Sequence, residues 1–144
     1  MNNVRIETFT LANHAESIND TLYLMGAGWT IMRRPLAAQP APSVFGMGLS
    51  VLTPWSETNK SNKLAVWLED EDGNEQLWRV DASMEVGRPP GSTHGADIRS
   101  VLALNNVFVF PRAGGYRAVA ELNGDPETRK IYPFRVHDVV VPAA

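Results

Sequence analysis

The sequence predicts an all-β protein, a single-domain antiparallel β-sandwich of about eight strands that spans residues 1–144 and has at most one short helix. Apolar and polar residues alternate at a spacing of two in many short segments, which is typical of strands with one buried face. Clusters of Gly, Pro, Asn and Asp separate these segments. No segment shows the long apolar stripe of an amphipathic helix. A chain of 144 residues suffices for one domain with a sizeable core.

The clearest strand pattern lies in residues 106–121, which predict a β-hairpin. β-branched and aromatic residues fill the first part of this stretch and suit a pleated, half-buried surface. Pro111, Gly114 and Gly115 then supply the backbone angles that a chain reversal needs. The residues from Tyr116 onward alternate again between two faces. We therefore expect two paired strands joined by a loop of about five residues.

The remaining strands follow in chain order, each bounded by turn residues. They are expected at residues 4–11, 21–32, 44–53, 63–69, 75–86, 96–104 and 130–141. Glycines interrupt two of them, so residues 21–32 form either one bent strand or two short ones, and residues 44–53 carry a bulge or approach another backbone closely. Residues 96–104 are too short to distinguish a strand from a short helix by periodicity.

The connections between these strands carry signals of their own. Residues 12–20 are polar and predict a turn or a single helical turn. Three prolines in residues 33–43 predict an exposed crossing between two sheets. Asp72 and Gly73 predict a tight hairpin turn, and residues 123–126 predict a second one.

Composition limits the classes of function. The net charge is −3, the basic residues form no run, and a nucleic-acid partner is therefore not expected. The apolar runs are too short to span a membrane, and the first residues lack the layout of a signal peptide. The chain has no cysteine, which excludes disulfides and thiolate metal sites and fits a reducing compartment. We expect a cytoplasmic protein without a cofactor.

Several segments together resemble a family of small bacterial proteins known as a domain of unknown function. The matching segments are residues 9–13, residues 21–29, the acidic hairpin at residues 70–73, Gly115-Tyr116-Arg117, and residues 133–136. The resemblance implies a single β-sandwich that covers nearly the whole chain, apart from the proline-rich loop at residues 35–42 and the tail after Asp138. It implies no activity and no site residues.

Four tryptophans in a small domain suggest that the protein acts by binding. Trp67 and Trp78 lie at nearly equal distances from the turn at residues 72–73, so we expect them to be cross-strand neighbours on one face. Trp55 follows Pro54 in a polar loop and is a candidate for an exposed anchor. Together with Arg79, these three tryptophans are the predicted binding residues, because interface hot spots favour Trp and Arg. The predicted partner is another protein or a second copy of the chain.

Two other functions stay open at this point. The tryptophans could instead stack on a carbohydrate or another small ligand. Alternatively, a metal-dependent enzyme could use His94, Asp97 and a second histidine, either His14 or His137, but their spacing matches no metal motif, and we expect no metal site and no catalytic residues. The acidic residues at 69–75 could bind Ca²⁺, but solvated charges at a hairpin tip explain them better.

Overall fold

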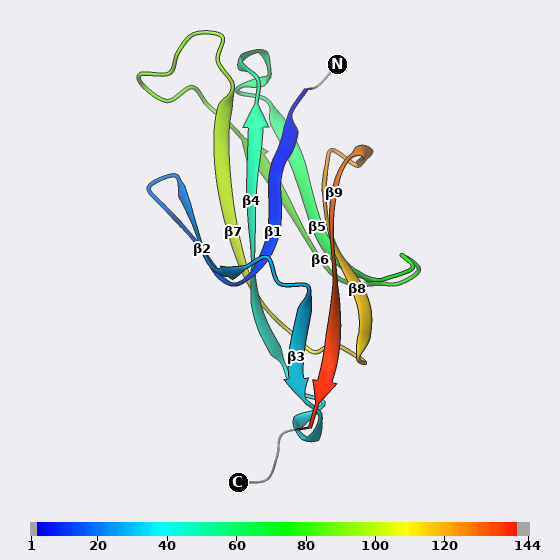
Figure 1. Cartoon of the computed structure of the whole chain (residues 1–144). Coiled ribbons are helices and arrows are strands. Elements are labelled where there is room, and N and C mark those ends of the chain that lie inside the picture. The colour runs from blue at the N-terminus through cyan, green and yellow to red at the C-terminus, as the bar shows by residue number, and fades with distance from the viewer. Residues whose placement is uncertain (1–2, 141–144) are drawn as a thin grey trace.

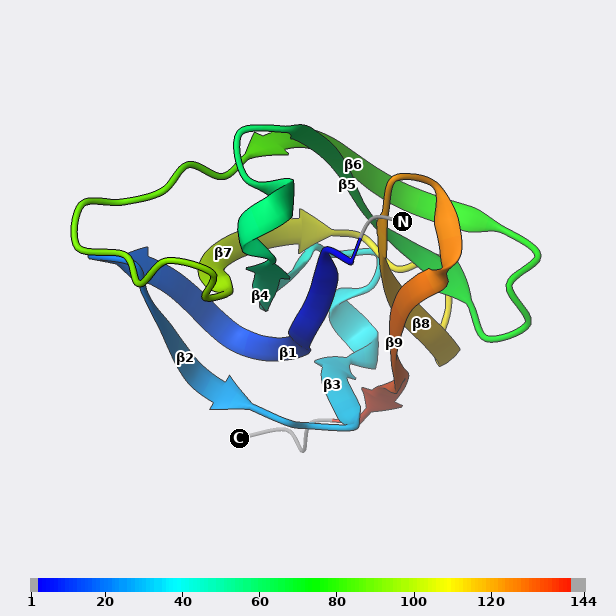
Figure 2. The ribbon, with the colours of Figure 1, turned by 90° about the horizontal axis from the view of Figure 1, so that it is seen from above.

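The protein is all-β, and its strands form two sheets. The computed structural model describes residues 3–140. The four-stranded sheet has the order β2 (Thr21–Ala27), β1 (Arg5–Ile18), β4 (Ser43–Thr53), β7 (Ile98–Phe108). The five-stranded sheet has the order β3 (Ile31–Pro35), β9 (Asp125–Val139), β8 (Gly114–Leu122), β5 (Ser61–Asp70), β6 (Gln76–Glu85). Two single turns of 3-10 helix, η1 (Leu36–Ala38) and η2 (Trp55–Glu57), complete the structure. The two sheets face each other as the layers of a sandwich (Figures 1 and 2), which confirms the predicted fold class.

One apolar core fills the space between the sheets, and the predicted two-residue alternation is confirmed on both sides of it. On β5, Leu64, Val66 and Leu68 are buried in this core, whereas Ala65 and Trp67 lie on the opposite face. The four-stranded sheet contributes mainly β4, whose core side chains are Phe45, Met47, Leu49 and Val51. Burial of this apolar surface is the main force that holds the two layers together.

Several predicted elements appear close to their expected bounds. Residues 21–32 form two short strands, β2 and β3, because Gly26 and Gly28 adopt positive φ angles of 64° and 87° that turn the chain from one sheet to the other. Residues 96–104 belong to a strand, β7. The crossing between sheets predicted at residues 33–43 is confirmed, since it joins β3 to β4. The last strand ends at Val139, and Val141, predicted to belong to it, lies outside the described residues.

One pair of strands departs from the predicted antiparallel arrangement. β3 pairs with β9 in a parallel register, from Ile31 opposite Arg135 to Pro35 opposite Val139. Every other pair of neighbouring strands in the described chain is antiparallel. β3 can run this way because it enters the five-stranded sheet from the other sheet, so no hairpin turn fixes its direction.

The predicted hairpin at residues 106–121 is wrong. β7 is an edge strand of the four-stranded sheet, whereas β8 pairs with β5 and β9 in the other sheet. The chain between them passes through the core, where the Phe110 side chain is only 1% exposed and contacts the rings of Phe108 and Tyr116. The Tyr116 hydroxyl then donates a hydrogen bond to the Arg112 carbonyl at 2.5 Å and fixes the crossing. Pro and Gly serve a crossing as well as a hairpin turn, so they could not distinguish the two.

The turn predicted at residues 12–20 is also wrong for most of its length. β1 continues to Ile18, and its second half pairs with β2 to form a two-stranded arm. This arm lies against the outer face of β4 and β7, where Ala15 exchanges two hydrogen bonds with the Asn105 side chain, at 3.0 and 2.7 Å. A Cβ atom on Gly46 would lie 2.7 Å from the Ala15 nitrogen. The close backbone approach expected for the glycines of this strand is therefore confirmed.

Tyr132 on β9 provides a pH-dependent contribution to stability. Its hydroxyl donates a hydrogen bond to the Trp29 carbonyl, and its ring packs edge-on against the indole at 6.3 Å between centroids. Burial raises the pKa of Tyr132 above its ordinary value. Since the folded state keeps this proton more tightly than the unfolded state, the contribution is complete below about pH 10 and is lost as the pH rises through the folded pKa.

We expect Tyr132→Phe to lower the free energy of unfolding by about 1 kcal/mol near pH 8 through the lost hydrogen bond. The variant should also lose less stability than the wild type between about pH 9 and pH 11, because the ionisable group is gone. Urea unfolding across this pH range measures both effects. Tyr23→Phe is the matched control, because Tyr23 is 53% exposed. Equal alkaline slopes for wild type and Tyr132→Phe would contradict the assignment.

Candidate functional surface

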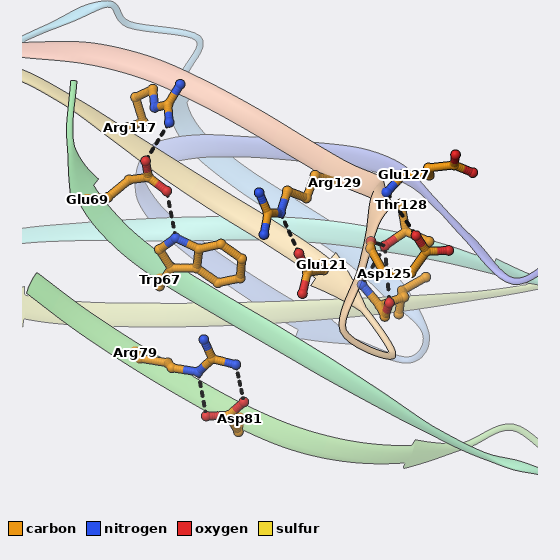
Figure 3. A network of polar contacts seen from close by, with 11 residues as sticks. Trp67, Glu69, Arg79, Asp81, Arg117, Glu121, Asp125, Glu127, Thr128 and Arg129 are labelled. Carbon is orange, nitrogen blue, oxygen red and sulfur yellow. Dashed lines mark hydrogen bonds and ion pairs between the residues drawn. The ribbon is translucent and has the colours of Figure 1, made fainter. Parts of the chain in front are cut away.

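A polar network covers the outer face of the five-stranded sheet (Figure 3) and contains two of the predicted binding residues. Trp67 is its centre, and this side chain is only 5% exposed although it points away from the main core. The guanidinium carbons of Arg79 and Arg129 lie 5.2 and 5.3 Å from the centre of its ring. These contacts are favourable, since cations are attracted to the face of an indole. They also leave little of Trp67 free for a partner.

Two buried glutamates extend the network across β5 and β8. The Glu69 carboxylate accepts hydrogen bonds from the Trp67 indole nitrogen at 2.7 Å and from Arg117 at 2.5 Å. The Glu121 carboxylate accepts a hydrogen bond from Arg129 of β9. A buried carboxylate is tolerated only when it is paired, so the arginines are needed for the fold. The glutamates in turn hold the arginines beside Trp67.

The remaining ion pairs lie at the margins of the network. Arg79 and Asp81 on β6 form a two-pronged pair with distances of 2.8 and 3.0 Å. These hydrogen bonds lower the pKa of Asp81 and raise the pKa of Arg79. Arg135 and Glu71 form an exposed pair at 3.1 Å. Each arginine of this network therefore has a carboxylate partner, and none of these arginines is unpaired and available to an anionic ligand.

The prediction that Trp67 and Trp78 are neighbours on one face is wrong. Trp67 is opposite Arg79 on β6, whereas Trp78 is opposite Leu68 and packs against the main core. The β5–β6 ladder shifts by one residue after Leu68, so that Glu69 is opposite Gln76. A shift of one residue moves a side chain to the other face of a sheet. The two indoles cannot form a common stacking platform for a carbohydrate.

Trp55, the candidate for an exposed anchor, contacts two side chains of the loop between β6 and β7. It is half-buried in η2, where the guanidinium carbon of Arg88 lies 4.0 Å from the centre of its ring. His94 packs on the same indole at 4.8 Å between centroids. Arg88 also donates hydrogen bonds to the Trp55 carbonyl and to the Thr58 hydroxyl, at 2.9 and 2.7 Å. Trp55 thus anchors the long loop between β6 and β7 to the body of the protein.

The residues considered for metal binding have other partners. His94 contacts Trp55, and Asp97 forms an exposed ion pair with Arg5 at 3.1 Å. Asp70, at the acidic hairpin, accepts hydrogen bonds from the backbone nitrogens of Asn74 and Glu75 and thereby shapes the turn. Within residues 3–140 no three His, Asp or Glu side chains are close enough together to hold a metal ion.

Two features that the sequence reasoning missed are the free edge of β7 and a cavity beside the β3–β4 crossing. The edge was missed because β7 was expected to pair with the strand that follows it. The cavity was missed because residues 33–43 were interpreted only as a connection, although Arg33 and Arg34 stand together at its start. Both features depend on which strands become neighbours, and no local pattern contains that information.

Across residues 3–140 the structure contains no helix with the length and apolar character needed to cross a membrane.

Comparison with known proteins identifies the family. A search of curated proteins found no match to the chain. The sequence model of DUF6941, described as a family of unknown function, matches residues 7–137. Because the match covers most of the chain, the protein belongs to this family of unknown function.

Proposed function

We propose that the protein is a non-enzymatic binding protein that associates with a second copy of itself by adding a strand to the free edge of β7. The supporting observation is the length and regularity of this edge. β7 pairs with β4 over eleven consecutive residue pairs, from Ser43 opposite Phe108 to Thr53 opposite Ile98, without a register shift. Within residues 3–140 no strand pairs with the other side of β7. Such an edge presents backbone groups that can pair with another chain.

Both edges of the five-stranded sheet, β6 and β3, carry features that discourage pairing, and β7 does not. β6 bears the Arg79–Asp81 pair, and its ladder with β5 contains a register shift. β3 is only five residues long and ends in Pro35. Natural proteins protect edge strands with charges, proline, bulges and short length. β7 has eleven residues, contains neither proline nor lysine, and carries Arg99 as its only charged residue.

Apolar side chains on both faces of β7 would be buried by an added strand. Leu102, Leu104 and Phe108 are half-buried at the margin of the core. On the outer face, Val107 is 66% exposed. Strand addition would combine main-chain hydrogen bonds with burial of these groups. A cytoplasmic setting is part of this proposal, since a chain without cysteine suits a reducing compartment.

We expect Val107→Lys to weaken self-association by at least about tenfold, because a lysine on the edge strand opposes the approach of a second strand. Val44→Lys is the matched control, because it places the same charge on the same face one strand away from the edge. Both valines are exposed, so both variants should fold. Sedimentation velocity over a series of concentrations measures the association. A wild-type protein that stays monomeric, or equal weakening by the two variants, would contradict the proposal.

A further inference from the structure

The β3–β4 crossing lies at the lower end of the molecule in Figure 1. It borders a cavity of about 540 Å³. This volume lies within the range of about 300–1,000 Å³ that is usual for sites of small ligands. The Gln39 side chain holds the crossing in place, since it donates to the Pro35 carbonyl at 3.0 Å and accepts from the Ala41 nitrogen at 3.1 Å. Trp29 and Val44 supply apolar surface from the two sides. The segment that borders the cavity is therefore held in place by hydrogen bonds within the crossing.

The charged side chains that line this cavity within residues 3–140 are two arginines. They are Arg33 and Arg34, and no Asp or Glu of the described chain contributes to the lining. Arg34 is only 6% exposed, and its guanidinium is held by Asp138 at 2.5 Å and by the Phe110 carbonyl at 2.9 Å. These bonds use Nε and Nη1, and Nη2 makes no hydrogen bond within residues 3–140. Arg33 is exposed and forms no ion pair in the same part of the chain.

Trp29, which also lines this cavity, has a buried hydrogen-bond donor without an acceptor in the described part of the chain. The indole nitrogen of Trp29 is buried and has no hydrogen-bond partner in the described part of the chain. The ring itself is fixed by edge-on contacts with Tyr132 and Phe134, at 6.3 and 5.8 Å between centroids. Buried donors without acceptors are rare in folded proteins and call for an explanation at each site. The Trp29 ring itself lines the cavity, so a bound ligand would lie against it.

We propose that this cavity binds a small organic anion, a carboxylate attached to an apolar body. Arginine matches the planar geometry of a carboxylate and remains charged at every physiological pH. Arg34 is already held in place by Asp138 and Phe110, so its free Nη2 is pre-oriented, and Arg33 adds a second charge. The apolar body would lie against Trp29 and Val44. The same chemistry is offered by a free carboxylic acid and by the C-terminus of a short peptide.

The proposal can be tested by titrating the ¹⁵N-labelled protein with phenylacetate and following the four indole N–H signals by NMR. We expect a saturable shift of the Trp29 signal at concentrations up to about 10 mM, with much smaller shifts of Trp67 and Trp78, which do not line the cavity. Phenylacetamide has the same apolar body without the charge and should bind at least about tenfold more weakly. Acetyl-alanyl-phenylalanine with a free or an amidated C-terminus distinguishes a peptide source from a free acid.

Arg33→Gln is the informative variant, because its side chain is exposed and its loss should leave the fold intact. We expect it to weaken phenylacetate binding about tenfold, whereas Arg112→Gln, an exposed arginine outside the cavity, should leave binding unchanged. Ala38→Phe, which fills part of the cavity, should abolish the Trp29 shift. Equal binding of acid and amide, no Trp29 shift for any probe, or an unaffected Arg33→Gln variant would overturn the proposal. None of these results depends on self-association through β7.

Discussion

Replacing Phe110 with alanine is expected to lower the free energy of unfolding by about 3–5 kcal/mol, the usual cost of truncating a buried phenylalanine. Phe110 is 1% exposed, and its ring contacts Phe45, Phe108, Tyr116 and Phe134 at centroid distances of 6.1, 4.8, 4.9 and 5.9 Å. The variant would leave a cavity at the point where the chain passes from one sheet to the other. Urea unfolding followed by circular dichroism measures the loss.

The neighbouring Val109 supplies the control for this experiment. Its side chain is 46% exposed, so Val109→Ala should change the free energy of unfolding by less than about 1 kcal/mol. Similar small effects of the two variants would contradict the burial of Phe110 at the crossing between the sheets.

Replacing Arg117 with methionine is expected to lower the free energy of unfolding by about 2–4 kcal/mol, because the buried Glu69 carboxylate loses its charged partner. Part of the loss is offset, since the Nε atom of Arg117 is buried without a hydrogen-bond partner in the described chain and is removed as well. Methionine keeps most of the apolar contacts of the arginine stem. Chemical denaturation at neutral pH measures the difference.

A double-mutant cycle separates the ion pair from the packing around it. Glu69→Gln combined with Arg117→Met leaves no unpaired charge, and the new amide oxygen can still accept the Trp67 hydrogen bond. We expect the double variant to recover at least about 2 kcal/mol relative to Arg117→Met alone. Arg135→Met is the exposed counterpart and should cost at most about 1 kcal/mol. If Arg117→Met lowers the free energy of unfolding no more than Arg135→Met does, the buried Glu69 carboxylate does not need Arg117 as its charged partner.

The position of the Trp67 side chain depends on contacts of the same network. Its indole donates to Glu69, and Arg79 and Arg129 flank its ring. Residue type alone predicted this tryptophan and Arg79 as binding residues, because Trp and Arg are enriched at interfaces. Their side chains instead satisfy one another. The exposed apolar residue of the proposed interface, Val107, carries no such local signal, since scattered surface valines are ordinary.

Local patterns predicted the strands better than they predicted which strands pair. The alternation of residues 64–68 correctly indicated a strand with two different faces, because successive side chains of a strand point to opposite faces whatever its neighbours are. The same reasoning placed Trp78 on the wrong face of the sheet. Which face a residue of β6 occupies depends on its register with β5, and β6 has one extra residue between the partners of Leu68 and Glu69. The polar character of residues 12–18 suggested a turn, yet these residues continue β1.

The sequence by itself determined that this chain is an all-β domain with two buried layers, since two-residue periodicity and turn residues act over a few positions and need no distant contact. Only the tertiary structure decided that β7 and β8 belong to different sheets, that β7 has a free edge, and that Arg33 and Arg34 meet at a cavity. Each of these features depends on contacts between segments far apart in the chain. Those contacts depend on how well all segments together fill the core, and no short stretch of residues determines that outcome.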